Sequence, residues 1–147
     1  MSDHEEIKQF LLDHLNTVRD GNVEGYHHTT DEDLTLYEWW VTPNRIDGLG
    51  FHDFLIEENA RKGTTFGSEA EPGGEGSRSR FDLSNLKIQQ YGDTAIANYT
   101  LLVTTSSSSG IVVKSHNESR VMVKINSQWK VVHVHKSPSW NAPHQPV

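Results

Sequence analysis

The chain has 147 residues, no cysteine and a formal net charge of −7 at neutral pH. This length is enough for one domain that buries a core, and the absence of cysteine excludes disulfides, thiolate catalysis and cysteine-ligated zinc. No apolar run approaches the ~20 residues of a membrane span, and no cluster of Lys and Arg offers a surface to phosphates, so neither a membrane nor a nucleic acid is an expected partner.

The acidic N-terminus lacks the basic and apolar regions of a signal peptide, which favours a cytoplasmic protein. Ser2 begins a capping box, and apolar residues then recur at helical spacing as far as Val18. Gly21 follows as a stop signal, so the pattern predicts one amphipathic helix. A shorter helix is expected over residues 23–28.

The middle of the chain shows one short strand and a third helix. Residues 34–38 have the composition of a strand, and residues 48–59 are interpreted as a loop that enters a helix with buried Phe51, Phe54 and Leu55. Residues 61–80 are rich in Gly and charge. We interpret them as one long mobile loop inside a single domain of residues 1–147, because no repeat and no second core appears in the sequence.

The C-terminal half is rich in strands. Four β-type runs separated by short polar turns are expected at residues 83–91, 94–104, 111–125 and 129–136. Connections this short predict an antiparallel meander. Residues 138–147, which contain three prolines, are expected to form a flexible tail.

Neither face of the expected sheet is cleanly polar. A sheet with one face in water normally alternates apolar and polar residues, and a single long helix can cover only one face. We therefore expect copies of the chain to associate through the uncovered apolar face, the alternative being that loops or the tail cover it within the monomer. By alternation along the last two strands, this face consists of Val121, Val123, Ile125, Trp129, Val131, His133 and His135.

His133 and His135 stand two residues apart, a spacing that can also hold a metal ion. The sequence places no third ligand beside them. Packing in the interface is therefore favoured over metal ligation, and neither a metal nor a cofactor is expected.

Three stretches carry a family resemblance. Residues 117–121 (Asn-Glu-Ser-Arg-Val) and 128–137 (Gln-Trp-Lys-Val-Val-His-Val-His-Lys-Ser) form an apparent closing hairpin, while residues 20–26 and 31–52 match an early turn and a central segment. In this order and spacing they resemble the association (hub) domain of calcium/calmodulin-dependent protein kinase type II.

The resemblance implies an α+β fold of the NTF2-like cone type, in which a curved antiparallel sheet cups a long helix. It also implies that copies pair through their sheets and form a two-tiered ring that gathers kinase subunits, with a kinase domain or its tether peptide as partner. The chain itself carries no kinase motif, and its 61–80 loop is longer than that of the family.

Carried over by position, the resemblance implies a carboxylate-binding pocket between helix and sheet. Its positions are occupied here by His52, Arg120, Lys136, Glu38 and Thr100, the last standing where the family has a further arginine. A buried cation needs an anionic partner, because an unpaired buried charge costs several kcal/mol. Three partners stay open: Glu38 as an internal ion pair with Arg120, a small organic acid, or an acidic peptide of the protein's own tether.

NTF2-like scaffolds also carry enzymes such as ketosteroid isomerases and SnoaL-type cyclases, which use an Asp or His of the cavity as a general base. His52 and Tyr37 are the candidates for such roles here. Arg120 and Lys136 suit anion binding better than proton abstraction beside a carbonyl. A non-catalytic assembly module is therefore the preferred hypothesis, and an enzyme or an acid-binding sensor is the alternative.

Overall fold

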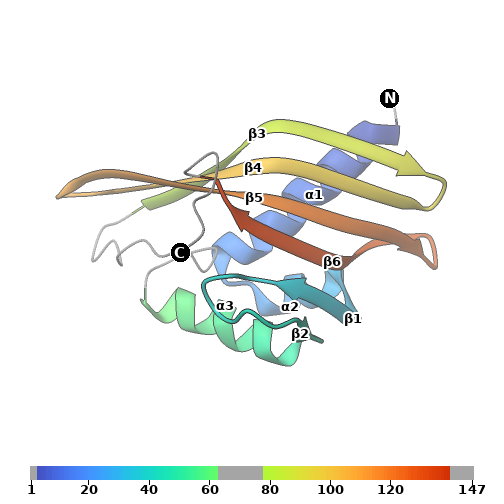
Figure 1. Cartoon of the computed structure of the whole chain (residues 1–147), viewed down its shortest axis with the longest axis horizontal. Helices are drawn as coiled ribbons and strands as arrows, with labels where there is room; N and C mark the ends of the chain where they lie inside the picture. The colour runs from blue at the N-terminus through green and yellow to red at the C-terminus, as the bar shows by residue number, and fades with distance from the viewer. Residues whose placement is uncertain (1–2, 63–77, 140–147) are drawn as a thin grey trace.

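A six-stranded sheet organises the molecule, and the computed structural model describes residues 3–62 and 78–139 of it (Figure 1). The predicted meander is confirmed: the last four strands pair antiparallel with their sequence neighbours. Two further pairings were not predicted: β1 runs parallel to β6, and a short β2 pairs antiparallel with β1. In spatial order the strands are β2 (Ile46–Asp47), β1 (Thr30–Tyr37), β6 (Gln128–Pro138), β5 (Gly110–Ile125), β4 (Thr94–Ser107) and β3 (Arg78–Tyr91).

Three helices accompany the sheet: α1 (Asp3–Asp20), α2 (Val23–Thr29) and α3 (Gly50–Lys62). Figure 1 shows α1 running diagonally behind β3, β4 and β5. Gly21 ends α1 as predicted. It takes a left-handed φ of 66°, and the amides of Gly21 and Asn22 bond back to the carbonyls of Val18 and Thr17.

The core lies between α1 and one face of the sheet, which we call the inner face; the opposite side is the outer face. Along β4 the alternation of burial follows the sequence pattern. The buried side chains of α1 are Ile7, Leu11, Leu15 and Val18, and those of β4 on the inner face are Ala95, Ala97, Tyr99, Leu101 and Val103.

A register shift between β5 and β6 reverses part of the predicted outer set. Val121 lies opposite His133 and Met122 opposite Val131, so Val132 is an extra residue on β6. This bulge turns Trp129 and Val131 to the inner face, where they are 8% and 0% exposed. Their assignment to the assembly face was therefore wrong, because a bulge cannot be recognised from strict alternation.

The outer face carries a row of half-buried side chains across four strands. Ile96 of β4 pairs with Val121 of β5, Val121 with His133 of β6, and His133 with Thr35 of β1. The Thr35 hydroxyl and His133 Nδ1 lie 2.8 Å apart, within hydrogen-bond distance.

The remaining members of the predicted assembly face are partly or fully open. Val123 is half-buried, Ile125 is 38% exposed, and His135 is exposed.

Three segment predictions need correction. In α3 the buried residues are His52 and Ile56, whereas Phe51 and Phe54 are 46% and 55% exposed; the side chain of Leu55 lies outside the described part. The predicted loop 61–80 is shorter, because α3 reaches Lys62 and β3 begins at Arg78. Residues 63–77 lie outside the described residues.

The predicted tail also begins later than expected. Pro138 ends β6, and the Ser139 hydroxyl lies 2.8 Å from that of Ser115. Residues 140–147 lie outside the described residues. Within the described ranges, no helix has the length and apolar character that a membrane crossing needs.

Candidate functional site

Four of the six predicted pocket residues meet on the inner face. Glu38 follows β1, His52 lies in the first turn of α3, Arg120 comes from β5 and Lys136 from β6. Each is at most 4% exposed. The fold thus gathers charged groups from four segments into one buried network.

Glu38 and Lys136 form one half of this network. Lys136 Nζ donates to Glu38 Oε1 at 2.6 Å, and His52 Nε2 lies 3.4 Å from the same oxygen. Burial alone would raise the pKa of Glu38, but Lys136 and the contact with His52 outweigh it and lower that pKa to about 2. Glu38 is therefore an ionised carboxylate at neutral pH. The Lys136 ammonium also lies 5.2 Å from the centre of the Trp40 ring.

Glu118 and Arg120 form the other half. Arg120 Nη1 pairs with Glu118 Oε1, and the Tyr99 hydroxyl donates to the same oxygen at 2.6 Å. His116 Nε2 lies 2.6 Å from Glu118 Oε2, and Lys136 Nζ lies 3.8 Å from it, which joins the two halves. Burial opposes ionisation of Glu118, yet Arg120 and the His116 hydrogen bond hold its pKa well below the ordinary value.

The network is balanced in charge, since two carboxylates face two cations. The internal partner of Arg120 is Glu118, and Glu38 pairs with Lys136; the sequence had suggested Glu38 as the partner of Arg120. Each cation has a carboxylate within the chain, so the pocket carries no excess positive charge.

One edge of the Arg120 guanidinium remains unpaired among the described residues. Nη1 serves both Tyr99 and Glu118, whereas Nε and Nη2 have no hydrogen-bond partner. These two donors form the edge of a guanidinium that binds a carboxylate with two parallel hydrogen bonds.

Two buried histidines extend the network towards α1. The Tyr26 hydroxyl contacts His52 Nδ1, and His14 Nδ1 lies 2.8 Å from the Thr29 hydroxyl. Burial lowers the pKa of both His14 and His52, with Arg120 contributing in the same direction. Both imidazoles are therefore neutral at pH 7. The neutral His52 carries its proton on Nε2 towards Glu38 and accepts at Nδ1 from Tyr26, whose pKa burial raises.

The structure does not bring Thr100 and Tyr37 into this pocket. Thr100 lies on the outer side of β4 and donates to Asn117 Oδ1 at 2.8 Å, while its neighbour Tyr99 points inward. The Tyr37 ring packs on the outer side against His135 and His133, at 5.1 and 6.1 Å between ring centres. Both predictions were wrong, because alternation within one strand does not reveal which residues of a neighbouring strand share its face.

Sequence reasoning missed several members of the network: His14, Tyr26, Tyr99, His116 and Glu118. For Glu118 a signal existed, since it stands two residues before Arg120 on the same strand and therefore on the same face. The position of His14 in the apolar stripe of the first helix was a weaker sign. Among the residues that the structure describes, no group of three or more His, Cys, Asp or Glu could hold a metal ion.

Comparison with known families gives a match over nearly the whole chain. The family model described as the calcium/calmodulin dependent protein kinase II association domain matches residues 3–140. No curated protein sequence matches the chain significantly.

Solved structures give the same fold. The chain is similar to the association domain of C. elegans CaMKII, with a TM-score of 0.74 at 24% identity over 91% of this chain and 94% of that one. It is similar to the CaMKII hub homology domain of Chlamydomonas reinhardtii, with a TM-score of 0.78 at 23% identity over 95% and 100% of the two chains. An NTF2-like protein of unknown function from Pseudomonas putida gives 0.67 at 18% identity over 95% and 88%. The predicted α+β fold of NTF2-like type is thereby confirmed.

Proposed function

Because the chain belongs to the calcium/calmodulin-dependent protein kinase II association domain family, we propose that it is a non-catalytic oligomerisation module. In this proposal copies pair through the outer face of the sheet, and the pairs assemble further into a ring. The ring gathers kinase-type subunits, and its partner is either a kinase domain or a tether peptide. Two of the similar structures are named as hub domains, which supports the proposal by family likeness. A cytoplasmic location stays a prediction from the sequence.

The apolar side chains of β4 and β5 on the outer face carry the proposal. Ile96, Val121 and Val123 are only half-buried by their own chain, although strands flank them on both sides. A second sheet laid on this face would complete their burial, and each buried methylene contributes about 0.8 kcal/mol. His133 and His135 lie beside them, and their exposure within one subunit fits side chains that pack between copies.

Solution mass tests the assembly. We expect native mass spectrometry to give a species many times heavier than the monomer, and Val123→Asp to disrupt pairing while the subunit remains folded. His4→Asp, at an exposed position of α1 on the other side of the sheet, is the matched control that should leave assembly intact. A wild-type chain that runs as a single subunit at high concentration would contradict the proposal.

The enzyme alternative requires His52 and Tyr37 to act in one cavity. It is not favoured, because Tyr37 lies on the outer face while His52 is buried on the inner one. The alternative would need a turnover that His52→Gln abolishes. We expect no turnover of steroid ketones or of small enolisable ketones. The measurement is the exchange of protons at the carbon beside the carbonyl.

We further propose that the network accepts one carboxylate at the Nε–Nη2 edge of Arg120. The two donors without a partner support this, whereas the balanced charge around them limits the affinity. The internal ion pairs are then structural, and a small organic acid or a carboxylate of the protein's own tether is the ligand.

Calorimetry with acetate and succinate tests the carboxylate site. Arg120→Lys is the informative variant, because it keeps the positive charge beside Glu118 and lacks the two-pronged edge. We expect at least about a tenfold loss of affinity, which corresponds to roughly 1.4 kcal/mol. Equal heats from both proteins would exclude this site and leave the assembly proposal unaffected.

A further inference from the structure

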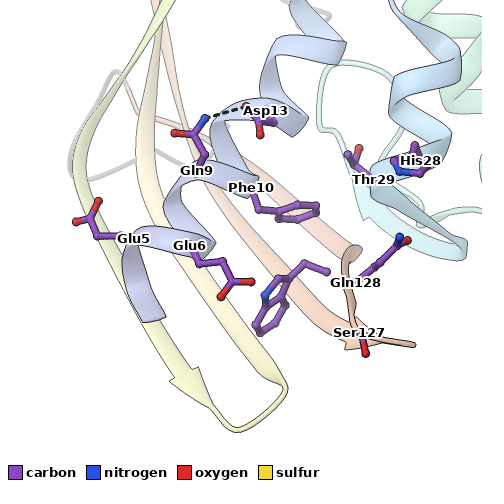
Figure 2. Close-up of a pocket in the computed structure, with 10 residues that line it drawn as sticks. Glu5, Glu6, Gln9, Phe10, Asp13, His28, Thr29, Ser127 and Gln128 are labelled. Carbon is purple, nitrogen blue, oxygen red and sulfur yellow. Dashed lines mark hydrogen bonds between the residues drawn. The ribbon is translucent and has the colours of Figure 1, made fainter. Parts of the chain in front are cut away.

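A cleft of about 700 Å³ opens beside the N-terminal half of α1, and none of Glu38, His52, Arg120 and Lys136 lines it (Figure 2). Its other walls are the end of α2, with His28 and Thr29, and the start of β6 with the turn before it. Phe10 of α1 and Trp129 of β6 supply an aromatic surface within it. A volume of this size is typical of a ligand or side-chain pocket.

The rim of this cleft is acidic. Glu5, Glu6 and Asp13 line it from α1, and none of its ten lining residues is Lys or Arg. The Trp129 indole makes a cation–π contact within the chain, with Lys124 Nζ 5.9 Å from its ring centre, so its ring face can bind an ammonium group. An aromatic floor under carboxylates complements an apolar group that carries a positive charge.

Such a group is presented by the β4–β5 turn of the same chain. Ile111, Val112 and Val113 are 72%, 50% and 57% exposed, and Lys114 beside them is exposed as well. Side chains alternate along β5, so Ile111 and Val113 occupy one face of the hairpin, while Val112 and Lys114 occupy the other. We call residues 104–114 the arm. The β5 side of the arm exposes apolar side chains on both of its faces, and an exposed apolar patch marks an interaction site.

The arm and the cleft lie at opposite ends of the molecule. Figure 1 shows the β4–β5 turn at one end of the long axis, and the N-terminus of α1 with the β5–β6 turn at the other. The arm therefore cannot enter the cleft of its own chain. A contact between two different surfaces of identical subunits repeats head to tail, and such contacts form a ring where the rotation between copies closes and a filament where it does not.

We propose that the arm of one copy docks in the cleft of the next copy, with Ile111 and Val113 against Phe10 and Trp129. Lys114, on the opposite face of the hairpin, then lies at the side of the cleft, and its long side chain reaches the carboxylates of the rim. This inference rests on the proposed assembly function and deepens it. Pairing through the outer sheet face is symmetric and ends at a dimer, whereas the arm and cleft link dimers into the ring.

Cross-linking tests the contact directly, because the chain has no cysteine of its own. The double variant Val113→Cys/Gln9→Cys places one thiol on the arm and one at the cleft. Oxidation should give a ladder of covalent oligomers on a non-reducing gel. The matched control Lys87→Cys/Gln9→Cys, with its first thiol on an exposed part of β3, should give none. A control that cross-links equally well would overturn the proposal.

Solution mass separates this inference from the proposed function. We expect Val113→Asp to yield dimers with an unchanged melting temperature, because the side chain is exposed in the subunit. A ring that survives Val113→Asp, together with an absent ladder, overturns the arm contact alone. A wild-type chain that remains a monomer overturns the proposed function, and the arm contact with it.

Charge reversal and a small amine probe give two further readouts. Lys114→Glu should weaken ring formation by up to about fivefold, the size of one exposed ion pair, and Glu6→Lys in the same chain should restore it. Phenylethylamine, titrated by calorimetry, should bind the Val113→Asp dimer and not the intact ring. Equal binding to both would mean that the cleft is open in the assembly and would overturn its occupation by the arm.

Discussion

The two faces of the sheet are made from the same strands, yet they differ in how completely the chain itself buries and pairs their side chains. On the inner face, buried charges and hydroxyls find nearly all their partners within the chain, as Glu118 does with Arg120, Tyr99 and His116. On the outer face, Ile96 and Val121 are only half-buried within the described chain. The inner face therefore stabilises the subunit, and the outer face is the surface through which we propose that subunits associate.

The largest expected effect comes from breaking the inner network at Glu118. Glu118→Ala leaves Arg120 as a buried charge without its carboxylate, which should destabilise the subunit by roughly 3–5 kcal/mol. Urea unfolding at fixed protein concentration measures this. Glu32→Ala, at an exposed position of β1, is the control. A loss below about 1 kcal/mol would show that the pair is not a structural element.

Neighbouring residues of β5 compare the two faces most directly. Met122 is fully buried on the inner face, whereas Val123 beside it is half-buried on the outer one. Met122→Ala should cost about 2–5 kcal/mol in unfolding free energy. Val123→Ala should change the stability of an isolated subunit by less than about 1 kcal/mol and instead weaken assembly. Equal losses of stability for both variants would contradict the distinction between the faces.

Acid should weaken the inner network in two steps. Burial lowers the pKa values of His14 and His52 in the folded chain. As the pH drops below about 6.5, these histidines therefore bind protons in the unfolded chain before they do so in the folded one, and the free energy of unfolding falls. From pH 6.5 to 5.5 we expect a loss of roughly 1–2 kcal/mol from the two groups. Glu38, with its pKa of about 2, contributes stability above the unfolded value of about 4.3, and this is lost as the pH falls towards 2.

Unfolding curves at several pH values measure the first step. His52→Gln should reduce the slope between pH 6.5 and 5.5, while His4→Gln, at an exposed position, should leave it unchanged. An unaltered slope in the His52 variant would mean that His52 does not gain a proton on unfolding in this range.

The smallest effect is expected from the outer row. Thr35→Val removes the hydroxyl that lies 2.8 Å from His133 Nδ1 and adds a methyl group to the surface that we propose to pack against another copy. The subunit should lose about 1 kcal/mol or less, and assembly should be retained. Thr94→Val, also half-buried on this sheet, is the comparison. Dissociation of the assembly by Thr35→Val would show that its hydroxyl, rather than apolar burial, holds the copies together.

Local sequence patterns predicted the elements well, because they depend on neighbouring residues. The stripe of α1, the stop at Gly21 and the four strands of the meander were all readable at spacings of two to four residues. The pairing of β1 with β6 was not readable, since nothing local in residues 30–37 indicates a partner about a hundred residues away.

The candidate site was predicted in part for the same reason. Glu38, His52, Arg120 and Lys136 came from a family resemblance, and all four lie in the network. Thr100 was misplaced because only the register between β4 and β5 shows which residues of β4 share a face with Arg120. Alternation within one strand does not contain that register. Trp129 was misplaced because of the bulge at Val132, where one extra residue places the positions before it on the face opposite to the one that alternation with His133 and His135 predicts.

The parallel pairing of β1 with β6 also sets an order of events during synthesis. Thr35 and His133, like Glu38 and Lys136, are separated by 98 residues, so the first strand leaves the ribosome long before its partner exists. Until the last strand arrives, β1 has only the two-residue β2 beside it, and Glu38 has no ammonium to neutralise it. Contacts at such separation form slowly, and a nascent chain halted before residue 128 would expose the edge of β1 to chaperones or to other unfinished copies.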